Sequence, residues 1–484
     1  MIISVKQRRE MMNRCNKVVE GGIPVTNPVN GEVVDYIPAM TKTEADRAVE
    51  EAGRGFLKWS ALPQYERSCI LEEFIRLFTP KIPELARLLV LENGKPVTEA
   101  EGEFGALKML TKGYCERANH MYGRTMPEGS GEGGGLHDIT FTRKEPLGIF
   151  VCIIPFNFPI AMFGHKVIPA LAAGNSVILK PATTSPLTLM KLTDLLHEAG
   201  VPQEVVQVVT GRGSDVGDVL AGHPGIQAIS MTGSTAAGLR IYERAARNLT
   251  RVFLELGAND AFIMLDDADV DLAVEEAILS RTLNAGQVCC GSKRFLVHHT
   301  LADEFEGKLK EALNRIVVGD PLKRSTQMGA LIGQEAADAV SNQVQRTISQ
   351  GAVCTWGGNR LDRAFFEPTI LREVTPEMDV AKDMEIFGPV FPIITFDKDE
   401  EALEIANQSS YGLSGAVFSR DIKRAIQMAD KLKSGSVVMN GGTDYRTVEL
   451  AFGGYKKSGI GREGISYTLD EMVQEKNFVL KGVL

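Results

Sequence analysis

The sequence predicts an α/β fold with two doubly wound parallel sheets. In its first half, short β-rich apolar runs that end in Pro or Gly alternate with helical segments: "GIFVCIIP", "SVILKP", "VVQVVTG" and "AISMTG". After residue 255 the pattern resumes with different strands: "AFIMLDD", "KRFLVHH", "FFEPTILREV" and "SGSVVMNGG". Buried strands that alternate with helices are typical of parallel sheets covered on both faces. The two series therefore indicate two α/β units.

The chain before residue 127 is predicted to be largely helical. Apolar residues recur at helical spacing in residues 41–59 and 71–110, with acidic residues near the expected helix starts. The Gly/Ser-rich stretch "PEGSGEGGG" at 127–135 is expected to be an exposed loop. "HDITFTRKEPLGIF" follows with alternating polar and apolar residues, which predicts an edge strand or a hairpin arm.

Composition indicates an ordinary globular protein, with about three domains as the expectation from length. The 484 residues are 44% hydrophobic and 24% charged, and the formal net charge is −9. This acidic balance argues against a nucleic-acid or anionic-membrane surface. No run approaches the roughly 18 apolar residues of a membrane span. The N-terminus is charged and lacks the apolar segment of a signal peptide, so a cytoplasmic protein is expected.

The cysteines and histidines predict neither a disulfide framework nor a metal site. The seven cysteines are scattered, odd in number and without a CxxC pair, as expected of reduced thiols. The seven histidines show no HExxH spacing. We therefore expect no metal.

Two strand ends carry groups that suit a nucleotide, because ligands bind beyond the carboxyl ends of strands in open α/β sheets. "AISMT" runs through Gly233 and Ser234 into a helix, whose free amides suit a phosphate; an ordinary capped helix is the alternative. Lys180 ends "SVILK" and could reach a ribose hydroxyl or a phosphate, or be a solvated surface lysine. "TGRGSDVG" at 210–217 has glycines at the wrong spacing for a dinucleotide fingerprint and is interpreted as a packing turn.

Glu255 and the pair Cys289–Cys290 are candidate reactive groups. Glu255 lies in apolar surroundings, where burial would raise its pKa as a general base requires; a partly exposed acid is the alternative. "NAGQVCCGSKRF" places the two cysteines in a glycine-flanked turn near Lys293 and Arg294. Amides and cations stabilise a catalytic thiolate, whereas a buried inert thiol is the usual alternative.

Together and in this order, these segments resemble the aldehyde dehydrogenase superfamily. The resemblance runs from "NPVNGEVV" at 27–34 to "AFGGYKKSGIGREG" at 451–464, with "PFNFP", "LKPA", "TGST", "LELG", "GQVC" and "EIFGPV" between them. It implies a cofactor-binding domain at 1–124 and 147–257, a catalytic domain at 258–466, and a small β oligomerisation element at 125–146 and 467–484. A terminal apolar strand leaves an open edge unless another chain covers it, so we expect a homodimer or homotetramer.

The resemblance also implies roles for individual residues. Cys289, two residues after Gln287, matches the nucleophile, and Asn157 matches the oxyanion donor, working with the Cys289 amide. Glu255 matches the general base, and Lys166 a lysine near that base. The implied cofactor contacts are Lys180, Thr183, Gly233, Ser234, Glu385 and Phe387; the implied substrate pocket is Phe158, Met162, His165, Val288, Cys290 and Phe452.

The implied reaction is the covalent oxidation of an aldehyde to a carboxylic acid, with NAD or NADP as cofactor. The Cys289 thiolate attacks the aldehyde, a hydride leaves for the nicotinamide, and water activated by Glu255 hydrolyses the thioester. An acylating, coenzyme A-dependent member is one alternative, which Glu255 disfavours because those relatives lack the glutamate base. A non-catalytic descendant is another, which the presence of Cys289, Asn157 and Glu255 disfavours.

Two positions bear on the choice of substrate. The succinic-semialdehyde branch presents arginines to the distal carboxylate, and the corresponding residues here are His165 and Leu283. Without a bidentate arginine clamp a buried carboxylate is poorly paired, so a neutral aromatic or aliphatic aldehyde is expected. A hydroxyaldehyde such as lactaldehyde is one alternative. Succinic semialdehyde is another, because Arg446 could take the place of the clamp.

Two further departures concern the backbone and the nucleotide. "LELGA" has Ala258 where the family usually has glycine, and we expect a small backbone adjustment if that position needs positive φ. NAD-selective relatives carry a glutamate three residues after the "LKPA" lysine, where this chain has Thr183. Without a carboxylate to repel a 2′-phosphate, NADP should be accepted at least comparably to NAD. Thr183 as a simple helix cap is the alternative.

Overall fold

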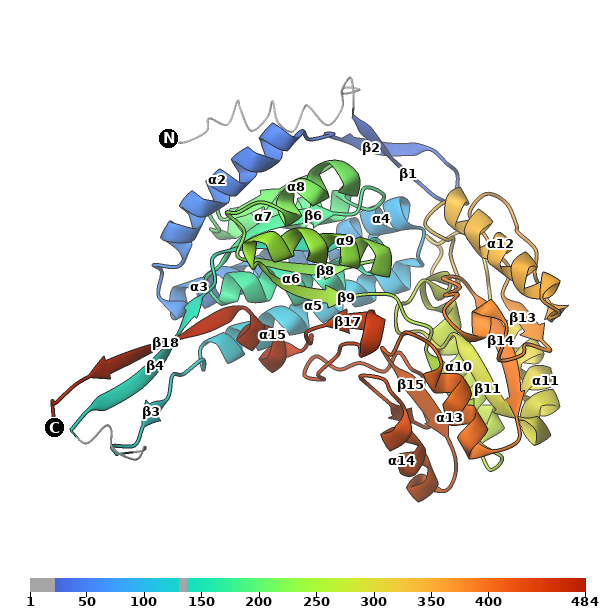
Figure 1. Cartoon of the computed structure of the whole chain (residues 1–484). Helices are drawn as coiled ribbons and strands as arrows, with labels where there is room; N and C mark the ends of the chain where they lie inside the picture. Colours follow the sequence, from blue (N-terminus) through green and yellow to red (C-terminus); the bar gives the residue numbers. More distant parts are fainter. Residues whose placement is uncertain (1–21, 130–136) are drawn as a thin grey trace.

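The computed structural model describes residues 22–129 and 137–484 of the chain. The prediction for the N-terminus, and that for most of the loop at 127–135, falls outside the described residues. In the described part, two α/β sheets and a small β arm form the fold (Figure 1).

The first sheet carries the strands that flank the expected nucleotide site. Its strands are β5 (Ile149–Ile154), β6 (Ser176–Pro181), β7 (Val206–Val208), β8 (Ala228–Thr232), β9 (Arg251–Glu255) and β17 (Gly459–Ile460). Their order is β17-β9-β8-β5-β6-β7, with parallel pairing except between β17 and β9. The chain fills one side of β5 with β6 and β7, then the other side with β8 and β9. Where the order reverses, between β5 and β8, such sheets open a ligand crevice at their carboxyl ends.

Helices cover both faces of this sheet because the side chains of its strands alternate between two cores. Phe150, Cys152 and Ile154 of β5 join one core, whereas Ile149 and Val151 join the other. The helices are α2 (Lys42–Trp59), α3 (Gln64–Phe78), α4 (Ile82–Asn93), α5 (Val97–Ala118), α6 (Pro159–Ala172), α7 (Leu187–Ala199), α8 (Asp218–Ala221) and α9 (Thr235–Ala245). The predicted packing turn at 210–217 includes a π-helical turn, Gly213–Gly217, that continues into α8.

The second sheet has seven strands. They are β10 (Ala261–Met264), β11 (Arg294–His298), β12 (Val353–Trp356), β13 (Thr369–Arg372), β14 (Val390–Phe396), β15 (Gly415–Phe418) and β16 (Val438–Met439). The order is β12-β13-β14-β11-β10-β15-β16, and all neighbours are parallel except β12 and β13. Its helices are α10 (Val270–Thr282), α11 (Ala302–Leu313), α12 (Gln334–Ser349), α13 (Asp399–Asn407) and α14 (Ile422–Lys431). The predicted α/β fold with two doubly wound sheets is confirmed, although β12, β14 and β15 were not among the predicted strands.

The third sheet is an antiparallel arm that extends from the body in Figure 1. It consists of β3 (Thr125–Met126), β4 (Ile139–Pro146) and β18 (Val473–Leu480), in the order β18-β4-β3. Phe141 and Phe478 are opposite each other, with stacked rings 5.0 Å apart between centroids. The segment predicted as an edge strand or hairpin arm is therefore β4. A short helix, α15 (Ile465–Glu471), precedes β18, and β1 (Ile23–Thr26) pairs with β2 (Val33–Ile37) at the start of the described chain.

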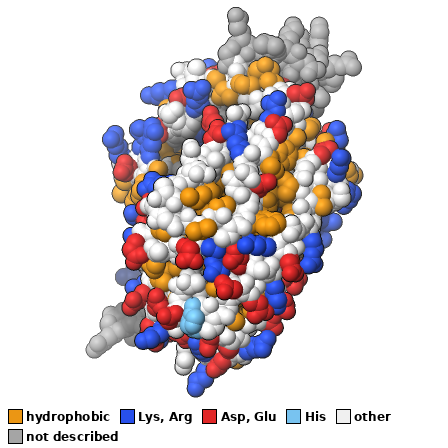
Figure 2. Space-filling model, turned by 90° about the vertical axis from the view of Figure 1, so that its right-hand side faces the viewer, with side chains coloured by type: hydrophobic (Ala, Val, Ile, Leu, Met, Phe, Trp, Pro, Cys, Tyr) orange, Lys and Arg blue, Asp and Glu red, His pale blue; other side chains and the backbone are white. Residues whose placement is uncertain are grey.

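The surface shows no single-sign field on the face drawn in Figure 2. Acidic and basic side chains alternate over this face, with apolar patches between them. Of the helices that the structure describes, none is long and apolar enough to cross a membrane.

Candidate active site

A cavity of about 510 Å³ lies where α5 and α6 meet the loops at 283–290 and 444–448. Its walls are mainly apolar, and His165 also lines a second, much smaller cavity beside Glu255. The predicted site residues that line it are Asn157, Phe158, Met162, His165, Val288, Cys289 and Cys290. The structure thus brings together residues that the sequence separates by more than a hundred positions.

The loop of residues 284–290, called the nucleophile loop after the role predicted for Cys289, has an unusual backbone. Asn284, Ala285 and Gly286 all have left-handed conformations, with φ of 47°, 53° and 77°. At Gly286 a Cβ atom would lie 2.4 Å from the Gly388 carbonyl, so the loop packs directly on the backbone ahead of β14. Left-handed backbone at non-glycine residues persists only where the surrounding structure imposes it. The loop that carries Cys289 is therefore held in a conformation that its own residues disfavour.

Asn157 is tied to this loop by hydrogen bonds in both directions. Its side-chain amide nitrogen donates to the Gln287 carbonyl at 3.0 Å, and the Asn284 amide donates to its backbone carbonyl at 2.9 Å. The first bond uses one of the two side-chain N–H groups of Asn157. The other N–H group has no acceptor among the described residues.

Cys289 and Cys290 differ in exposure and in acidity. Cys289 is partly exposed to the cavity, whereas Cys290 is buried. A hydrogen bond from the Cys290 thiol, together with the nearby Lys293 ammonium, lowers the pKa of Cys289 to about 7 despite its burial. The same hydrogen bond and burial raise the pKa of Cys290 well above its usual value. Of the two thiols, Cys289 is the one that is both accessible and ionised near neutral pH.

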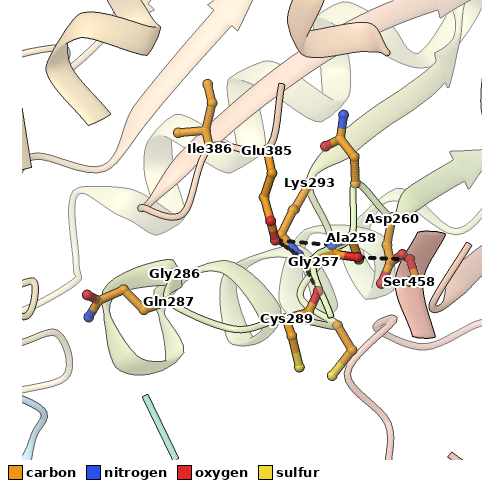
Figure 3. Close-up of polar contacts among 12 residues, drawn as sticks. Gly257, Ala258, Asp260, Gly286, Gln287, Cys289, Lys293, Glu385, Ile386 and Ser458 are labelled. Carbon is orange, nitrogen blue, oxygen red and sulfur yellow. Dashed lines mark hydrogen bonds and ion pairs between the residues drawn. The ribbon is translucent and has the colours of Figure 1, made fainter. Parts of the chain in front are cut away.

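The two cations near Cys289, Lys293 and Arg294, have different partners, and Figure 3 draws those of Lys293. Lys293 donates to the Cys289 carbonyl and pairs with the Glu385 carboxylate at 3.3 Å. Arg294 instead donates to the carbonyls of Asn259, Ala381, Ile405 and Ala406. Of the two cations expected near the thiol, Lys293 therefore acts on the site and Arg294 holds backbone.

Glu255 ends β9 inside a charged cluster next to the main cavity. It is 5% exposed, and its Oε2 atom has no hydrogen-bond partner among the described residues. Burial and the nearby Glu463 raise the pKa of Glu255 well above its usual value. For Glu463, burial opposes ionisation, but Lys166 and Arg446 outweigh it and hold its pKa well below the usual range. The predicted burial of Glu255 is thus observed, and the partly exposed alternative is wrong.

Lys166 reaches the cluster without touching Glu255 directly. Its ammonium group donates to Glu463 at 2.8 Å and to the Ser230 hydroxyl at 3.2 Å. The Arg446 guanidinium donates to the other oxygen of Glu463 at 2.6 Å and lies 4.0 Å from the Phe452 ring centroid. Lys166 therefore influences Glu255 through its charge.

The predicted nucleotide groups lie at the carboxyl end of the first sheet. Lys180 is buried, which lowers its pKa to about 8, so the alternative of a solvated surface lysine is wrong. Ser234 caps α9 by accepting from the Ala237 amide at 3.3 Å, and the Gly233 amide donates to the Glu255 carbonyl. Thr183 is half-buried and does not cap α7, which begins after Pro186 without a side-chain cap. Ser234 is therefore a helix cap, whereas Thr183 is not.

Glu385 and Phe387 precede β14 and face the loop after β9. The Ala258 amide donates to Glu385 at 3.4 Å, and the rings of Phe387 and Phe156 meet edge to face at 6.2 Å. Ala258 is not among the described residues with positive φ, so the backbone strain considered for this position does not arise. Instead Gly257, the preceding residue, packs closely on Glu385, where a Cβ would lie 2.7 Å from Oε2.

Two outcomes differ from the predicted substrate pocket. Phe452 is not among the cavity-lining residues and is buried in the same apolar cluster as Val288 and Cys290. The cavity wall also contains residues that sequence patterns did not single out: Ala106, Met109 and Leu110 of α5, and Asp444, Thr447 and Val448. The α5 residues share one helix face, a pattern that core packing produces equally well.

His165 occupies the position where a clamp arginine would stand. Burial and the nearby Arg446 charge lower the pKa of His165 to about 3, so its imidazole is neutral. Its Nδ1 atom lies 3.4 Å from the Tyr114 hydroxyl. Leu283 also lines the cavity, and Arg446 is the one guanidinium among the described lining residues. No group of three metal-ligating side chains occurs in the described residues.

Comparisons with known proteins agree with this arrangement. A sequence model described as the aldehyde dehydrogenase family matches residues 16–478. The chain is 39% identical to a 3-sulfolactaldehyde dehydrogenase of Pseudomonas putida, covering 95% of this chain and 93% of the relative. It is 37% identical to an NADP(+) succinate-semialdehyde dehydrogenase of Escherichia coli K12, covering 94% and 93%. A betaine aldehyde dehydrogenase of Staphylococcus aureus, solved with NAD+, superposes with a TM-score of 0.92 at 31% identity over 99% of this chain and 97% of that chain.

Proposed function

The chain belongs to the aldehyde dehydrogenase family, and we propose that Cys289 is the nucleophile through which it oxidises an aldehyde to a carboxylic acid with NAD+ or NADP+. One observation carries this assignment. Cys289 and Asn157 line the same apolar cavity, and the pKa of the Cys289 thiol is lowered to about 7. An accessible thiolate next to a hydrogen-bond donor is the arrangement that addition to a carbonyl requires.

The first step is addition of the Cys289 thiolate to the aldehyde carbon. A C–S bond forms, and the carbonyl oxygen becomes an oxyanion. The free N–H of the Asn157 side chain and the Cys289 backbone amide are the donors that we assign to this oxyanion. Losing one such donor typically removes about 2.7–4 kcal/mol of transition-state stabilisation.

The carboxyl end of the first sheet fits a dinucleotide. The Lys180 ammonium is buried and has one acceptor, the Pro181 carbonyl at 3.3 Å, among the described residues. Such a donor suits a ribose hydroxyl or a phosphate, and the N-terminus of α9 after Gly233 suits the pyrophosphate. We assign Glu385 and Phe387 to the nicotinamide ribose and ring. The chemistry that a bound nicotinamide would supply is acceptance of a hydride, which would leave the carbon attached to Cys289 as a thioester.

Glu255 is the base that we assign to thioester hydrolysis. It accepts a proton from water as the water oxygen attacks the thioester carbon; the C–S bond then breaks, and the acid and the thiolate separate. Burial and the Glu463 charge raise the pKa of Glu255, which makes its carboxylate a stronger base, while the Lys166 charge opposes that rise. The presence of this buried carboxylate favours hydrolysis over acyl transfer to coenzyme A. Adding coenzyme A to an assay of aldehyde-dependent NAD(P)H formation should leave the acid as the product.

The nucleotide preference that we propose rests on Thr183. A carboxylate at this position would repel a 2′-phosphate, whereas Thr183 offers a hydroxyl and leaves Lys180 free to pair with it. We expect NADP+ to be accepted at least comparably to NAD+. Thr183→Glu should shift the ratio of the two kcat/KM values toward NAD+ by about tenfold or more. A tenfold shift corresponds to a free-energy difference of about 1.4 kcal/mol. A wild-type enzyme that rejects NADP+ by a hundredfold would contradict this assignment.

The cavity supports a neutral aromatic or aliphatic aldehyde as substrate. Its walls are largely apolar, and neither His165 nor Leu283 supplies a charge to a distal acid group. One observation favours a second candidate, an aldehyde with a distal anionic group. Arg446 lines the cavity, and of its guanidinium nitrogens Nη2 alone donates a hydrogen bond within the described residues. Two of the relatives carry names with acidic substrates, 3-sulfolactaldehyde and succinate semialdehyde.

A panel of aldehydes separates these substrate classes. We expect benzaldehyde and propanal to exceed succinic semialdehyde in kcat/KM. The opposite order would overturn the neutral class and support the anionic one. In that case Arg446→Gln should raise KM for succinic semialdehyde while leaving KM for propanal within about twofold, because propanal has no anionic group with which the guanidinium could pair.

The assembly is also a proposal. We divide the chain into a cofactor-binding domain at 1–124 and 147–257, a catalytic domain at 258–466 and an oligomerisation element at 125–146 and 467–484. The outer edge of β18 has no strand neighbour among the described residues, which supports a homodimer or homotetramer. A monomer by light scattering at micromolar concentration would contradict it. The cytoplasmic location expected from the N-terminal residues stays a prediction.

A further inference from the structure

Three side chains from the start of α5 and the turn before it reach both loops of the site, although none lines the cavity. Lys95 follows α4 after the left-handed Gly94, and Glu99 and Glu103 lie one turn apart on α5. Lys95 is fully buried and pairs with Glu103, which is 5% exposed. A buried ion pair is weak evidence for added stability, because two apolar side chains would avoid its desolvation cost. The contacts of this pair indicate a different purpose.

Each partner of the ion pair holds the backbone on one side of Asn157. The Lys95 ammonium donates to the Asn157 carbonyl at 2.6 Å and lies 4.2 Å from the Phe158 ring centroid. Glu103 accepts from the amides of Ile160 and Ala161 at 3.0 and 3.2 Å. Helix α6 has no side-chain cap of its own, so Glu103 caps it from another helix. The ion pair thus fixes both the loop that carries Asn157 and the start of the helix that follows.

The same helix face holds the nucleophile loop. Glu99 accepts from the backbone amide of Asn284 at 2.9 Å, and the Asn284 side chain donates to the Asn157 carbonyl that Lys95 also contacts. Asn284 is one of the left-handed residues of the nucleophile loop, so an external partner is required where its backbone is disfavoured. The segments that carry the two donors assigned to the oxyanion, on Asn157 and at Cys289, are therefore both held by the start of α5 and the turn before it.

We propose that Lys95 and Glu103 are positioning residues that set the Asn157 amide relative to Cys289, and so determine the geometry of the oxyanion site. This inference rests on the proposed function of Cys289 and Asn157. It assigns no contact with substrate to either residue. Both act through the backbone of residues 157–161, and a shift of that backbone changes the distance between the donor and the oxyanion.

The test compares two reactions of Cys289 in Lys95→Met and Glu103→Gln. Formation of NAD(P)H in the first turnover requires the oxyanion, whereas alkylation of Cys289 by iodoacetamide forms none. We expect the burst rate constant to fall about tenfold or more, as for a displaced oxyanion donor, while the alkylation rate changes by no more than about threefold. General disruption of the site would slow both reactions.

Glu92→Gln is the matched control. Glu92 is a fully buried carboxylate that caps α7 from α4 by accepting from the Leu187 and Thr188 amides at 2.7 and 2.9 Å. It has the same chemistry as Glu103 but holds a different helix. Its substitution should lower the melting temperature while the burst rate constant, at saturating nucleotide, stays within about twofold of wild type, because the oxyanion donors keep their places.

A double-mutant cycle with Asn157→Ala makes the inference falsifiable. If Lys95 acts through Asn157, Lys95→Met should add less than about twofold to the loss in the Asn157→Ala protein. Losses that multiply in full, or an undiminished burst in both Lys95→Met and Glu103→Gln, would overturn the inference. If Lys95→Met does not fold, the nearly isosteric Glu103→Gln enters the same cycle. A wild-type enzyme that forms no NAD(P)H with any aldehyde would instead contradict the proposed function.

Discussion

The two large sheets contribute to the site from opposite ends of their strands. In the first sheet, Asn157, Gly233 and Glu255 lie at or just after the carboxyl ends of β5, β8 and β9. In the second sheet, Cys289 and Glu385 lie in loops that precede β11 and β14. The site is therefore a junction between the carboxyl edge of one sheet and loops at the amino edge of the other. The rule that ligands bind beyond strand carboxyl ends applies to the first sheet and not to the second.

This difference affects how each side holds its residues. Groups on the first sheet are positioned by regular strands and helix starts, such as Ser234 at the start of α9. The nucleophile is positioned by an irregular loop with left-handed residues, which depends on contacts from Glu99, Asn157 and the backbone at Gly388. We infer that substitutions around the loop that carries Cys289 reduce activity more than substitutions around the groups on the first sheet.

The largest expected effect lies on the second side. Cys289→Ala should reduce aldehyde oxidation by about three orders of magnitude or more, because no other group supplies the nucleophile. Nucleotide binding, followed by fluorescence quenching, should remain, since the first sheet provides it. Cys290→Ala is the control and should retain substantial activity. If the two variants behaved the other way round, the nucleophile would be Cys290.

On the first side, Glu255→Gln should separate the two half-reactions. The thioester should still form and release one equivalent of NAD(P)H, after which turnover should slow by about 10²–10⁴-fold for lack of a base. In a stopped-flow experiment we expect a full burst of NAD(P)H followed by slow steady-state NAD(P)H formation. Steady-state turnover at the wild-type rate would remove Glu255 from this role.

A smaller effect is expected from the charges around Glu255. Because burial and Glu463 raise the pKa of Glu255, the carboxylate form that acts as a base is lost as pH falls through this raised value. Glu463→Gln removes the repelling charge and frees Lys166 and Arg446 to stabilise the Glu255 carboxylate. The acid limb of the kcat profile should therefore move to lower pH. A limb that stayed in place would show that another group controls it.

The smallest expected effect concerns the acidity of the nucleophile. The Cys289 thiolate is present above its pKa of about 7 and is lost as pH falls through that value. Cys290→Ala removes the thiol that stabilises it, so the pH dependence of iodoacetamide alkylation should shift upward, toward the ordinary thiol value. An unchanged profile would leave Lys293 as the main source of the shift.

Local patterns in the sequence predicted β5, β6, β7 and β8 of the first sheet and β10, β11, β13 and β16 of the second, together with residues at the carboxyl ends of the first. Apolar runs that end in Pro or Gly report strands directly, and Lys180, Gly233 and Glu255 follow such runs immediately. The resemblance of several motifs to one family added Cys289 and Asn157. These inferences needed no long-range contact, because each depends on residues within a few positions of one another.

Tertiary structure decided what burial and distant partners do to these residues. Glu255 and Glu463 are both buried carboxylates, yet their pKa values move in opposite directions, because Lys166 and Arg446 flank Glu463. Phe452 packs behind the cavity, while Met109 of α5 lines it. The contacts of Lys95, Glu99 and Glu103 join segments that lie up to 185 residues apart in the sequence. Such effects depend on distances between segments, which local sequence patterns do not encode, because electrostatic energy and desolvation are set by all the groups that surround a charge.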